Sequence, residues 1–255
     1  MTTTFTPPKL GAFPGDDAAT AGVPWNYQEV CGQGHIFLED YMGSDLSVVN
    51  NARISFGQQE HTLNLKDKGL INFLIREKHG SPFESVTFRF DIMAPIFVVR
   101  EWHRHRAGHS YNEWSGRYME IPDPMGYIPK REDIREMVPD SKPGAYKYQT
   151  IESDSTVIVY NDLVENSYKI AFETYRTLLD LGAAKEIARV VLPVGMFTRF
   201  KWTCNLRSAL HFISLRNSEH AQREIRYYGV AVEKLIGEIC PTVLEKFIEH
   251  GRVAP

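Results

Sequence analysis

The sequence predicts an α+β fold in which helices predominate around a smaller sheet. Residues 86–92 alternate apolar and polar side chains, which is the period of a strand with one buried face. Several longer stretches instead repeat their apolar residues at helical spacing, and the longest of them spans residues 155–181. Because 255 residues can bury one large core, we expect a single domain over residues 27–255.

The first 26 residues are rich in Thr, Pro, Gly and Ala and show little periodic hydrophobicity. A stretch of this composition has too little apolar surface to form a regular element of its own. We therefore interpret it as an irregular N-terminal arm.

Two helices are expected before the strand. The first begins at Asp45, a plausible N-cap, and its apolar stripe consists of Leu46, Val49, Ile54 and Phe56. The second covers residues 63–78 and should end before Gly80 and Pro82, because both residue types interrupt helices.

The strand and three later helices complete the expected core. In the strand, four apolar residues alternate with three polar ones, namely Val86, Phe88, Phe90 and Ile92 with Thr87, Arg89 and Asp91. Helices are expected over residues 155–181, ended by Gly182, then before Pro193, and over residues 218–239 before Pro241. Residues 119–148 contain five prolines and many charges, so we interpret them as a long surface excursion.

Charge and cysteine content exclude several classes of protein. The formal net charge is −3, so we expect no nucleic-acid partner. Cys31, Cys204 and Cys240 are widely spaced and form no CxxC pair, which fits free thiols in a reducing cytoplasm. No run of about 18 apolar residues and no basic-then-apolar N-terminus occurs, so we expect neither membrane insertion nor secretion.

The most informative stretch is residues 102–118, which read WHRHRAGHSYNEWSGRY. It concentrates three arginines, three histidines and several small polar residues in a short segment. Burying a guanidinium costs several kcal/mol unless it meets an anion. The segment therefore predicts a binding site for a small ligand that carries phosphates or carboxylates.

This segment resembles the signature of the flavin-dependent thymidylate synthases. The resemblance rests on Arg104-His105-Arg106, Asn112-Glu113 and Ser115-Gly116-Arg117-Tyr118. Eight residues, Ala107 to Trp114, separate the triplet from the serine, whereas the family usually has seven. We expect the extra residue to form a bulge between Ala107 and Tyr111 that leaves both halves of the signature in place.

Further blocks extend the resemblance over most of residues 40 to 250. They are Ala52-Arg53-Ile54-Ser55-Phe56, His79-Gly80-Ser81-Pro82-Phe83-Glu84, Ala188-Arg189-Val190-Val191-Leu192-Pro193, and Asn205-Leu206-Arg207-Ser208 with His211, Leu215-Arg216 and Glu219-His220-Ala221. The chain lacks the third glycine of a dinucleotide fingerprint and has no phosphate-binding loop. Any flavin must therefore bind without a Rossmann unit, as the resemblance also implies.

The resemblance implies a mainly antiparallel sheet and a reductive methylation of dUMP to dTMP. FAD would receive hydride from NADPH, and the carbon would come from methylenetetrahydrofolate. A homotetramer with sites shared between subunits is implied as well. The implied contacts to FAD are Ser55, Ser81, Glu84, Arg104, His105, Arg106, Asn205, Arg207, His211 and His220. The implied contacts to dUMP are Glu101, Glu113, Ser115, Gly116, Arg117, Arg189 and Arg216.

The resemblance implies three catalytic residues, Arg216, Arg104 and His79. Methylation at C5 places negative charge on the uracil carbonyls, and one well-aimed donor there is worth about 10²–10³ in rate. The resemblance puts Arg216 at the pyrimidine, so we expect it to be that donor. The family often has Gln where Glu101 stands, and an ionised carboxylate there would repel phosphate unless Arg104 or Arg117 neutralises it.

Simpler interpretations remain open for each of these residues. The arginines of the signature could pair with Glu101, Glu113 or Glu120, and Arg189 or Arg216 with Glu186 or Glu219. His79, Ser55 and Ser81 could be helix caps, Glu84 could accept from a backbone donor, and His220 could be an exposed helix residue.

Other activities also remain open. A metal on His103, His105 and His109 lacks a supporting framework, so we expect no metal. Cys204 has no adjacent base and is expected to be a packed thiol, not a nucleophile. The alternatives to the synthase are a flavoprotein with another pyrimidine reaction, or a non-enzymatic RNA- or phospholigand-binding module with Tyr111, Trp114 and Tyr118 as stacking faces.

Overall fold

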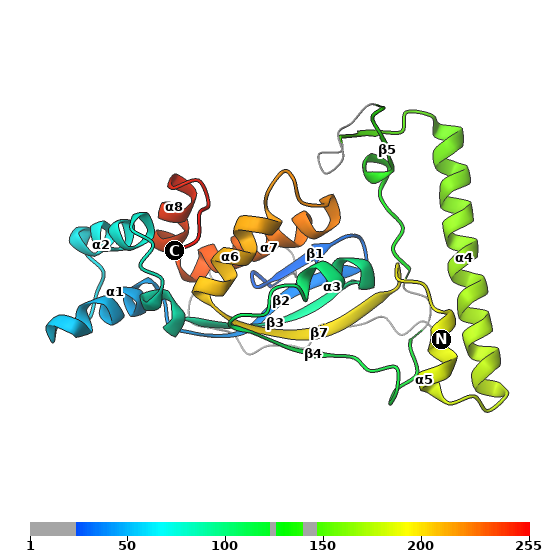
Figure 1. Cartoon of the computed structure of the whole chain (residues 1–255), viewed down its shortest axis with the longest axis horizontal. Coiled ribbons are helices and arrows are strands. Elements are labelled where there is room, and N and C mark those ends of the chain that lie inside the picture. Colours follow the sequence, from blue (N-terminus) through cyan, green and yellow to red (C-terminus); the bar gives the residue numbers. More distant parts are fainter. Residues whose placement is uncertain (1–23, 123–125, 140–146) are drawn as a thin grey trace.

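The computed structural model describes residues 24–122, 126–139 and 147–255. Its centre is a five-stranded antiparallel sheet of order β1-β2-β3-β7-β4 (Figure 1). The strands are β1 (Tyr27–Val30), β2 (Gly34–Met42), β3 (Thr87–Pro95), β7 (Phe197–Asn205) and β4 (His109–Glu113). A separate pair joins β5 (Arg135–Met137) to β6 (Tyr148–Thr150). The predicted α+β fold with a mainly antiparallel sheet is confirmed.

Helices cover one face of the sheet and enclose the main core (Figure 1). They are α3 (Ile96–Trp102), α6 (Leu206–Arg216), α7 (Arg223–Ile239) and α8 (Pro241–Glu249), with α1 (Asp45–Arg53) and α2 (Leu65–Arg76) at one end of the sheet. The buried side of β3 carries Phe88, Phe90 and Ile92, as its alternation predicts. Trp102 meets Trp202 of β7 edge-on, with ring centroids 5.1 Å apart.

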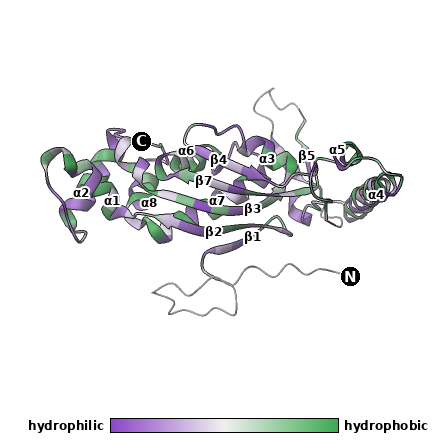
Figure 2. Cartoon of the chain, turned by 90° about the horizontal axis from the view of Figure 1, so that it is seen from below, coloured by the Kyte–Doolittle hydropathy of each residue, from purple (hydrophilic) through white to green (hydrophobic). Residues whose placement is uncertain are grey.

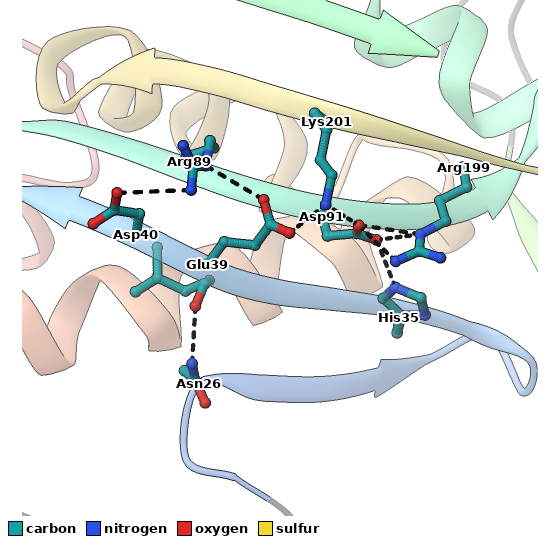
Figure 3. Close-up of polar contacts among 9 residues, drawn as sticks. Asn26, His35, Glu39, Asp40, Arg89, Asp91, Arg199 and Lys201 are labelled. Carbon is teal, nitrogen blue, oxygen red and sulfur yellow. Dashed lines mark hydrogen bonds and ion pairs between the residues drawn. The ribbon is translucent and has the colours of Figure 1, made fainter. Parts of the chain in front are cut away.

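The opposite face of the sheet carries charged side chains that neutralise one another (Figure 3). Asp91 is fully buried at the centre of this face. Its carboxylate lies 2.9 Å from His35 Nε2 and accepts two hydrogen bonds of 2.8 Å from Arg199 Nε and Nη2. Lys201 forms ion pairs with both Asp91 and Glu39, so each of these two carboxylates has a basic partner.

The first predicted helix is present but its cap is different. Ser44 is the N-cap of α1, and its backbone N–H donates to Ser47 Oγ at 3.1 Å. The prediction of Asp45 as the cap was wrong, because its carboxylate accepts instead from the backbone N–H groups of Thr242 and Val243 at 2.8 and 3.0 Å. The Asp45 carboxylate accepts hydrogen bonds from N–H groups in the first turn of α8 that have no partner within that helix, and the positive end of the helix dipole attracts it. Asp45 therefore ties α8 to α1.

The other predicted helices are confirmed with shifted ends. The first α-helical stretch ends at Arg53 and continues as a 3-10 turn, η1 (Ile54–Phe56). The second, α2, is capped by the side chain of Asn64 and is followed by η2 (Ser81–Ser85). The last, α7, begins at Arg223 and not at residue 218, since residues 218–222 form a turn with Ala221 N–H bonded to the Ser218 carbonyl.

The longest helix, α4 (Asp154–Asp180), stands at the far end of the sheet from α1 and α2 (Figure 1). Its C-terminal half packs on α5 (Lys185–Ala188) and η4 (Arg189–Val191) through a second core of Phe172, Tyr175, Ala188 and Met196. Figure 2 shows α4 end-on, apart from the helices that cover the sheet. Its N-terminal half leaves Ile158, Val159 and Leu163 more than half exposed.

The segment expected to be a surface excursion is partly built into the fold. Residues 123–125 and 140–146 lie outside the described residues. In the described part, η3 (Arg131–Asp133) and β5 are attached to α7, because Arg135 pairs with Glu224 through bonds of 2.8 and 2.9 Å. Tyr127 and Ile134 are buried there, so the expectation of a purely surface segment was wrong.

The predicted arm falls largely outside the description, which begins at Pro24. Asn26 is buried, and its side-chain amide donates to the Leu38 carbonyl at 2.9 Å. The residues just before Tyr27 therefore already belong to the folded unit.

Candidate active site

The Arg-His-Arg triplet lies in the turn between α3 and β4. Strand β4 is the edge of the sheet and pairs regularly with β7 from His109 to Glu113. The hydroxyl of Tyr111 donates to the His105 carbonyl at 2.7 Å and so closes the turn. Gly108 lies in the stretch expected to bulge; it has a φ of +74°, and a Cβ there would lie 2.2 Å from Ser208 Oγ. The one-residue bulge itself stays a prediction.

Two histidines of this turn are held in the neutral form. His105 is buried, and its Nε2 accepts a hydrogen bond of 3.0 Å from Arg216 Nε. Burial, followed by the charge of Arg216, lowers the pKa of His105 to about 3. His109 accepts at Nδ1 from Trp202 Nε1 at 2.9 Å, and burial lowers its pKa to about 4. Both rings are therefore acceptors at neutral pH, and neither adds a positive charge to the site.

Arg216, the last residue of α6, is held by groups from α3 and the turn after it. Its Nη1 donates to Glu101 Oε2 at 2.8 Å, and its Nη2 donates to the Glu101 carbonyl at 2.9 Å. Both side chains are largely buried, 16% and 25% exposed respectively. The ion-pair partner of Glu101 is Arg216, and not Arg104 or Arg117; Arg104 only adds a weaker attraction.

The other two arginines of the triplet are exposed cations. Within the described residues, neither Arg104 nor Arg106 forms a hydrogen bond or an ion pair. The possible surface pairing of these two arginines with Glu101, Glu113 or Glu120 is thus not observed. Their charges remain available to an anionic ligand.

A pocket of about 480 Å³ opens beside this turn, at the N-terminus of α6. It is lined by Glu84, Ala107, Gly108, Asn205, Arg207, Ser208, His211, Ala254 and Pro255. Arg207 donates to Glu84 at 2.6 Å and to the Pro255 carbonyl at 3.0 Å. A Cβ on Gly80 would lie 2.3 Å from Arg207 Nε, so any larger residue at position 80 would force this arginine to move. We name this hollow the α6 pocket.

A second, smaller pocket of about 140 Å³ lies at the other end of β4 and β7. It is lined by Ile96, Glu113, Trp114, Gly116, Ile121, Arg189, Leu192, Met196, Phe197 and Thr198. Arg189 crosses directly over Gly116, where a Cβ would lie 3.0 Å from Arg189 Cδ. Thr198 donates to the Glu113 carboxylate at 2.8 Å. We name this hollow the β4 pocket.

A family model described as thymidylate synthase complementing protein matches residues 37–242. The chain belongs to the flavin-dependent thymidylate synthase family. A protein of Thermosipho melanesiensis with the name flavin-dependent thymidylate synthase is 41% identical over 88% of this chain and 94% of its own length. A protein of Thermotoga neapolitana with the same name is 42% identical over 87% and 94%.

A solved structure has a similar fold. It is a UMP/dUMP methylase, PolB from Streptomyces cacaoi, bound with 5-Br UMP. The two chains are 38% identical, the TM-score is 0.77, and the match covers 87% of this chain and 96% of that one. The predicted resemblance to the flavin-dependent thymidylate synthase family is confirmed.

The structure brings the family's implied flavin contacts only partly together. Four of them line the α6 pocket, namely Glu84, Asn205, Arg207 and His211. Ser55 and His220 do not line it; Ser55 is exposed in η1, and His220 is exposed after α6. His79, just before η2, and Ser81, its first residue, are both exposed, and the His79 ring packs against Phe73 with ring centroids 5.5 Å apart. The implied nucleotide contacts divide in the same way, with Glu113, Gly116 and Arg189 at the β4 pocket and Glu101 and Arg216 near His105.

The alternative pairings of three other arginines are also tested. Arg117 lies 3.4 Å from Glu186 in an exposed ion pair, which contributes at most about 1 kcal/mol. Arg189 donates to the Glu186 carbonyl at 3.4 Å, and Arg216 pairs with Glu101 and not with Glu219.

Sequence reasoning missed several residues around the two pockets. Ser208 donates to the Ala107 carbonyl at 2.9 Å and so joins α6 to the signature turn. Ala254 and Pro255 reach the α6 pocket from the end of the chain, and no local motif predicts that. The Ser208 contact was open to prediction, because the residue stands next to Arg207 in a block already assigned to the site.

The remaining sequence expectations concern metals and membranes. Among the described residues, no three His, Cys, Asp or Glu side chains gather in a way that could hold a metal ion. His103 packs against Tyr111 and His109 stacks on Trp202. None of the described helices has the length and apolar character needed to cross a membrane.

Proposed function

We propose that this protein forms dTMP by reductive methylation of dUMP, with methylenetetrahydrofolate as the carbon donor and FAD reduced by NADPH. Residues 27–255 act as a single catalytic domain. The observation that carries the proposal is the α6 pocket, where four residues that the sequence assigns to FAD surround one hollow of ligand size. Membership of the family supports the reaction class.

The described residues suit a flavin dinucleotide. The exposed guanidinium groups of Arg104 and Arg106 have no counterion among the described residues and match a diphosphate. Asn205 and His211 offer polar side chains to a ring system in the α6 pocket. Ser55, Ser81, His105 and His220 complete the proposed FAD contacts. Bound FAD would supply the two-electron chemistry that the methylation requires.

The β4 pocket is proposed to hold the phosphate end of dUMP. Arg189 provides its cation, and the absence of a side chain at Gly116 allows close approach. Ser115 and Arg117 follow in the same turn and would bind the phosphate through charge-assisted bonds of roughly 1.5–3 kcal/mol each. Glu113 would then accept from the nucleotide or position Thr198.

Arg216 is proposed to contact the pyrimidine and to stabilise the negative charge that develops on its carbonyl oxygens. Arg104 lies in the same turn and adds positive potential near the reacting rings. His79, which lies just before η2, is proposed as the third catalytic group. Removal of Arg216 should therefore lower kcat more than removal of Arg117, by about 10²-fold or more.

The first experiment is the absorption spectrum of the purified full-length chain after addition of FAD and removal of the free flavin. We expect a two-banded flavin spectrum near one FAD per chain, a change in it on addition of dUMP, and dTMP formation with NADPH and methylenetetrahydrofolate. A chain that retains no flavin under any condition would refute the proposal. Tight, salt-sensitive RNA binding by such a chain would favour the binding module.

UMP is a second candidate substrate. The similar structure from Streptomyces cacaoi is described as a UMP/dUMP methylase and was bound with 5-Br UMP. The same assay with UMP in place of dUMP decides between the two. We expect dUMP to be methylated with the higher kcat/KM, and a preference for UMP would assign the other pyrimidine reaction.

The assembly is proposed to be a homotetramer with sites shared between subunits. Two features support a partner copy. The N-terminal half of α4 exposes Ile158, Val159 and Leu163, an apolar surface that water disfavours. The β4 pocket, at about 140 Å³, is also too small for a whole nucleotide within one chain.

The oligomeric state tests this assembly directly. We expect light scattering to give the mass of four chains for the wild type. Ile158→Glu with Leu163→Glu should reduce that mass and abolish dUMP methylation, while exposed Ile248→Glu on α8 should leave the mass unchanged. A wild-type monomer with full activity would contradict shared sites.

A further inference from the structure

Glu101 stands in a position that does not fit a direct contact to nucleotide phosphate. Its carboxylate is used by Arg216 Nη1 at 2.8 Å, and its carbonyl oxygen is used by Nη2 at 2.9 Å. An ionised carboxylate and a phosphate repel each other, and both oxygens that Glu101 uses here are engaged by Arg216. The same residue therefore binds the guanidinium twice, through the side chain and through the main chain.

The guanidinium of Arg216 is fixed on a third side by His105. Nε donates to His105 Nε2 at 3.0 Å, and this ring stays neutral and able to accept because burial and Arg216 itself lower its pKa to about 3. An arginine has five N–H donors in one plane. Three of them are used here, so one N–H on each terminal nitrogen remains for a ligand.

The backbone of Arg216 is fixed as well. Helix α7 crosses it at Gly229, where a Cβ would lie 2.8 Å from the Arg216 carbonyl carbon and 2.9 Å from its oxygen. Only glycine permits this approach between α6 and α7. The last residue of α6 is thus held at both ends of its side chain, which is the rigidity that an aimed donor needs.

We propose that Glu101 is a positioning residue, which together with His105 orients Arg216 toward the uracil carbonyls and does not itself contact the nucleotide. The inference rests on the proposed function and changes the role of one of its residues. The paired charges of Glu101 and Arg216 nearly cancel, so this part of the site suits the uncharged pyrimidine, whereas Arg189 suits the phosphate. Two further charges affect the pKa of Glu101: Glu224 raises it, and Arg104 lowers it.

The test is a double-mutant cycle on the FAD-loaded protein, with Glu101→Leu, Arg216→Leu and the double variant. If Glu101 acts only through Arg216, the double variant has the same kcat as Arg216→Leu alone. We expect Glu101→Leu to lower kcat by about 10- to 100-fold with a KM for dUMP that changes by less than about threefold. Independent losses that multiply in the double variant would overturn the proposal.

A conservative variant separates position from charge. Glu101→Gln keeps an acceptor oxygen for Nη1 and should retain kcat within about threefold, as rescue by geometry requires. A Gln variant that loses dUMP binding as strongly as Arg189→Ala would show a direct contact through charge and contradict the inference. Glu60→Leu is the matched control, because Glu60 forms a half-buried pair with Arg53 outside both pockets.

The failure of the proposed function gives a different result. A wild-type chain that neither methylates nor binds dUMP refutes the proposed reaction, whatever the variants do. In that case the free energies of unfolding of the four chains still test the pairing, because Glu101 and Arg216 must couple if they hold each other. Additive effects on unfolding would overturn the positioning role on structural grounds alone.

Discussion

Basic side chains gather around Asp91 and in the signature turn, but the two groups differ in what surrounds them. On the open face of the sheet, His35, Arg199 and Lys201 converge on one buried carboxylate (Figure 3). In the signature turn, Arg104 and Arg106 meet no carboxylate within the described residues. A cluster that contains its own anion serves the fold, and a cluster without one is prepared for an anion from outside.

The comparison is sharpest at Asp91, where the largest effect on stability is expected. Asp91→Leu leaves His35, Arg199 and Lys201 without their shared partner, and removal of one member of a buried pair costs about 3 kcal/mol at the lower end of its range. The lower end applies because the Lys201 side chain is 43% exposed. Denaturant unfolding measures the loss. An unchanged midpoint would mean that water replaces the carboxylate without cost.

The matching change in the signature turn should act on binding instead. Arg106→Ala removes a cation with no internal partner among the described residues, so we expect the free energy of unfolding to stay within about 0.5 kcal/mol of the wild type. FAD affinity should fall by roughly 1.5–3 kcal/mol, the worth of a charge-assisted bond. Flavin fluorescence titration measures it. A variant with a lower free energy of unfolding but unchanged FAD affinity would show that Arg106 serves the fold and not the ligand.

Acid distinguishes the two regions by the pH at which each loses stability. His109 and His105 have pKa values lowered to about 4 and about 3, so the unfolded chain binds protons that the folded chain does not as pH falls from 6.5. Their contribution to stability is complete above pH 6.5 and is lost toward those pKa values. Burial raises the pKa of Asp91, but bonds from His35, Arg199 and Lys201 outweigh burial and hold it well below its usual range. Its contribution is therefore lost only below about pH 4.

His109→Asn tests the loss of stability between pH 6.5 and 4. Asn keeps an acceptor for Trp202 Nε1 but cannot titrate. The slope of unfolding free energy against pH between 6.5 and 4 should fall by up to about 1.4 kcal/mol per pH unit. The slope below pH 4 should remain, because Asp91 is intact. An unchanged slope between 6.5 and 4 would show that His109 is not one of the groups responsible.

How far the sequence predicts this molecule depends on whether the signal is local. The alternation in β3 and the long stripe of α4 are local, and both elements occur within a few residues of their expected positions. The signature residues were assigned from motifs, yet the pairing of Glu101 with Arg216 joins positions 115 residues apart in sequence. Such contacts depend on how α3 and α6 are placed relative to each other, and a local sequence pattern cannot predict that arrangement.

The same reasoning explains the missed cap and the missed surroundings of the pockets. Ser44 and Asp45 are both good N-cap residues, so composition could not choose between them. The choice was made by α8, whose first N–H groups use the Asp45 carboxylate. Pro255 reaches the α6 pocket for a similar reason, since the chain after α8 is held over α6 by Ser214, which donates to the Arg252 carbonyl at 2.6 Å.

A smaller effect on dUMP binding is expected at Gly116, where the absence of a side chain makes room for Arg189. Gly116→Ala would place a Cβ 3.0 Å from Arg189 Cδ and 3.1 Å from Ile121 Cδ1, so Arg189 must shift by a few tenths of an ångström. We expect dUMP affinity to fall by about 1 kcal/mol with little change in stability, as for other small shifts of a charged partner. Gly69→Ala is the control, because no atom lies within 4 Å of its added Cβ. Calorimetric titration with equal dUMP affinities in both variants would contradict this role of Gly116.

The smallest effect on activity is expected at Cys204, which lies between the two compared regions on β7. Its side chain is 2% exposed in the main core, and burial raises the pKa of its thiol well above the ordinary value. A thiol that stays protonated cannot attack a pyrimidine, since the thiolate is the nucleophile. Cys204→Ala should keep kcat within about twofold and lower stability by about 1 kcal/mol, the worth of a small buried group. Complete loss of dTMP formation in a variant that still folds and retains flavin would make Cys204 a nucleophile and overturn the assignment of this chemistry to Arg216.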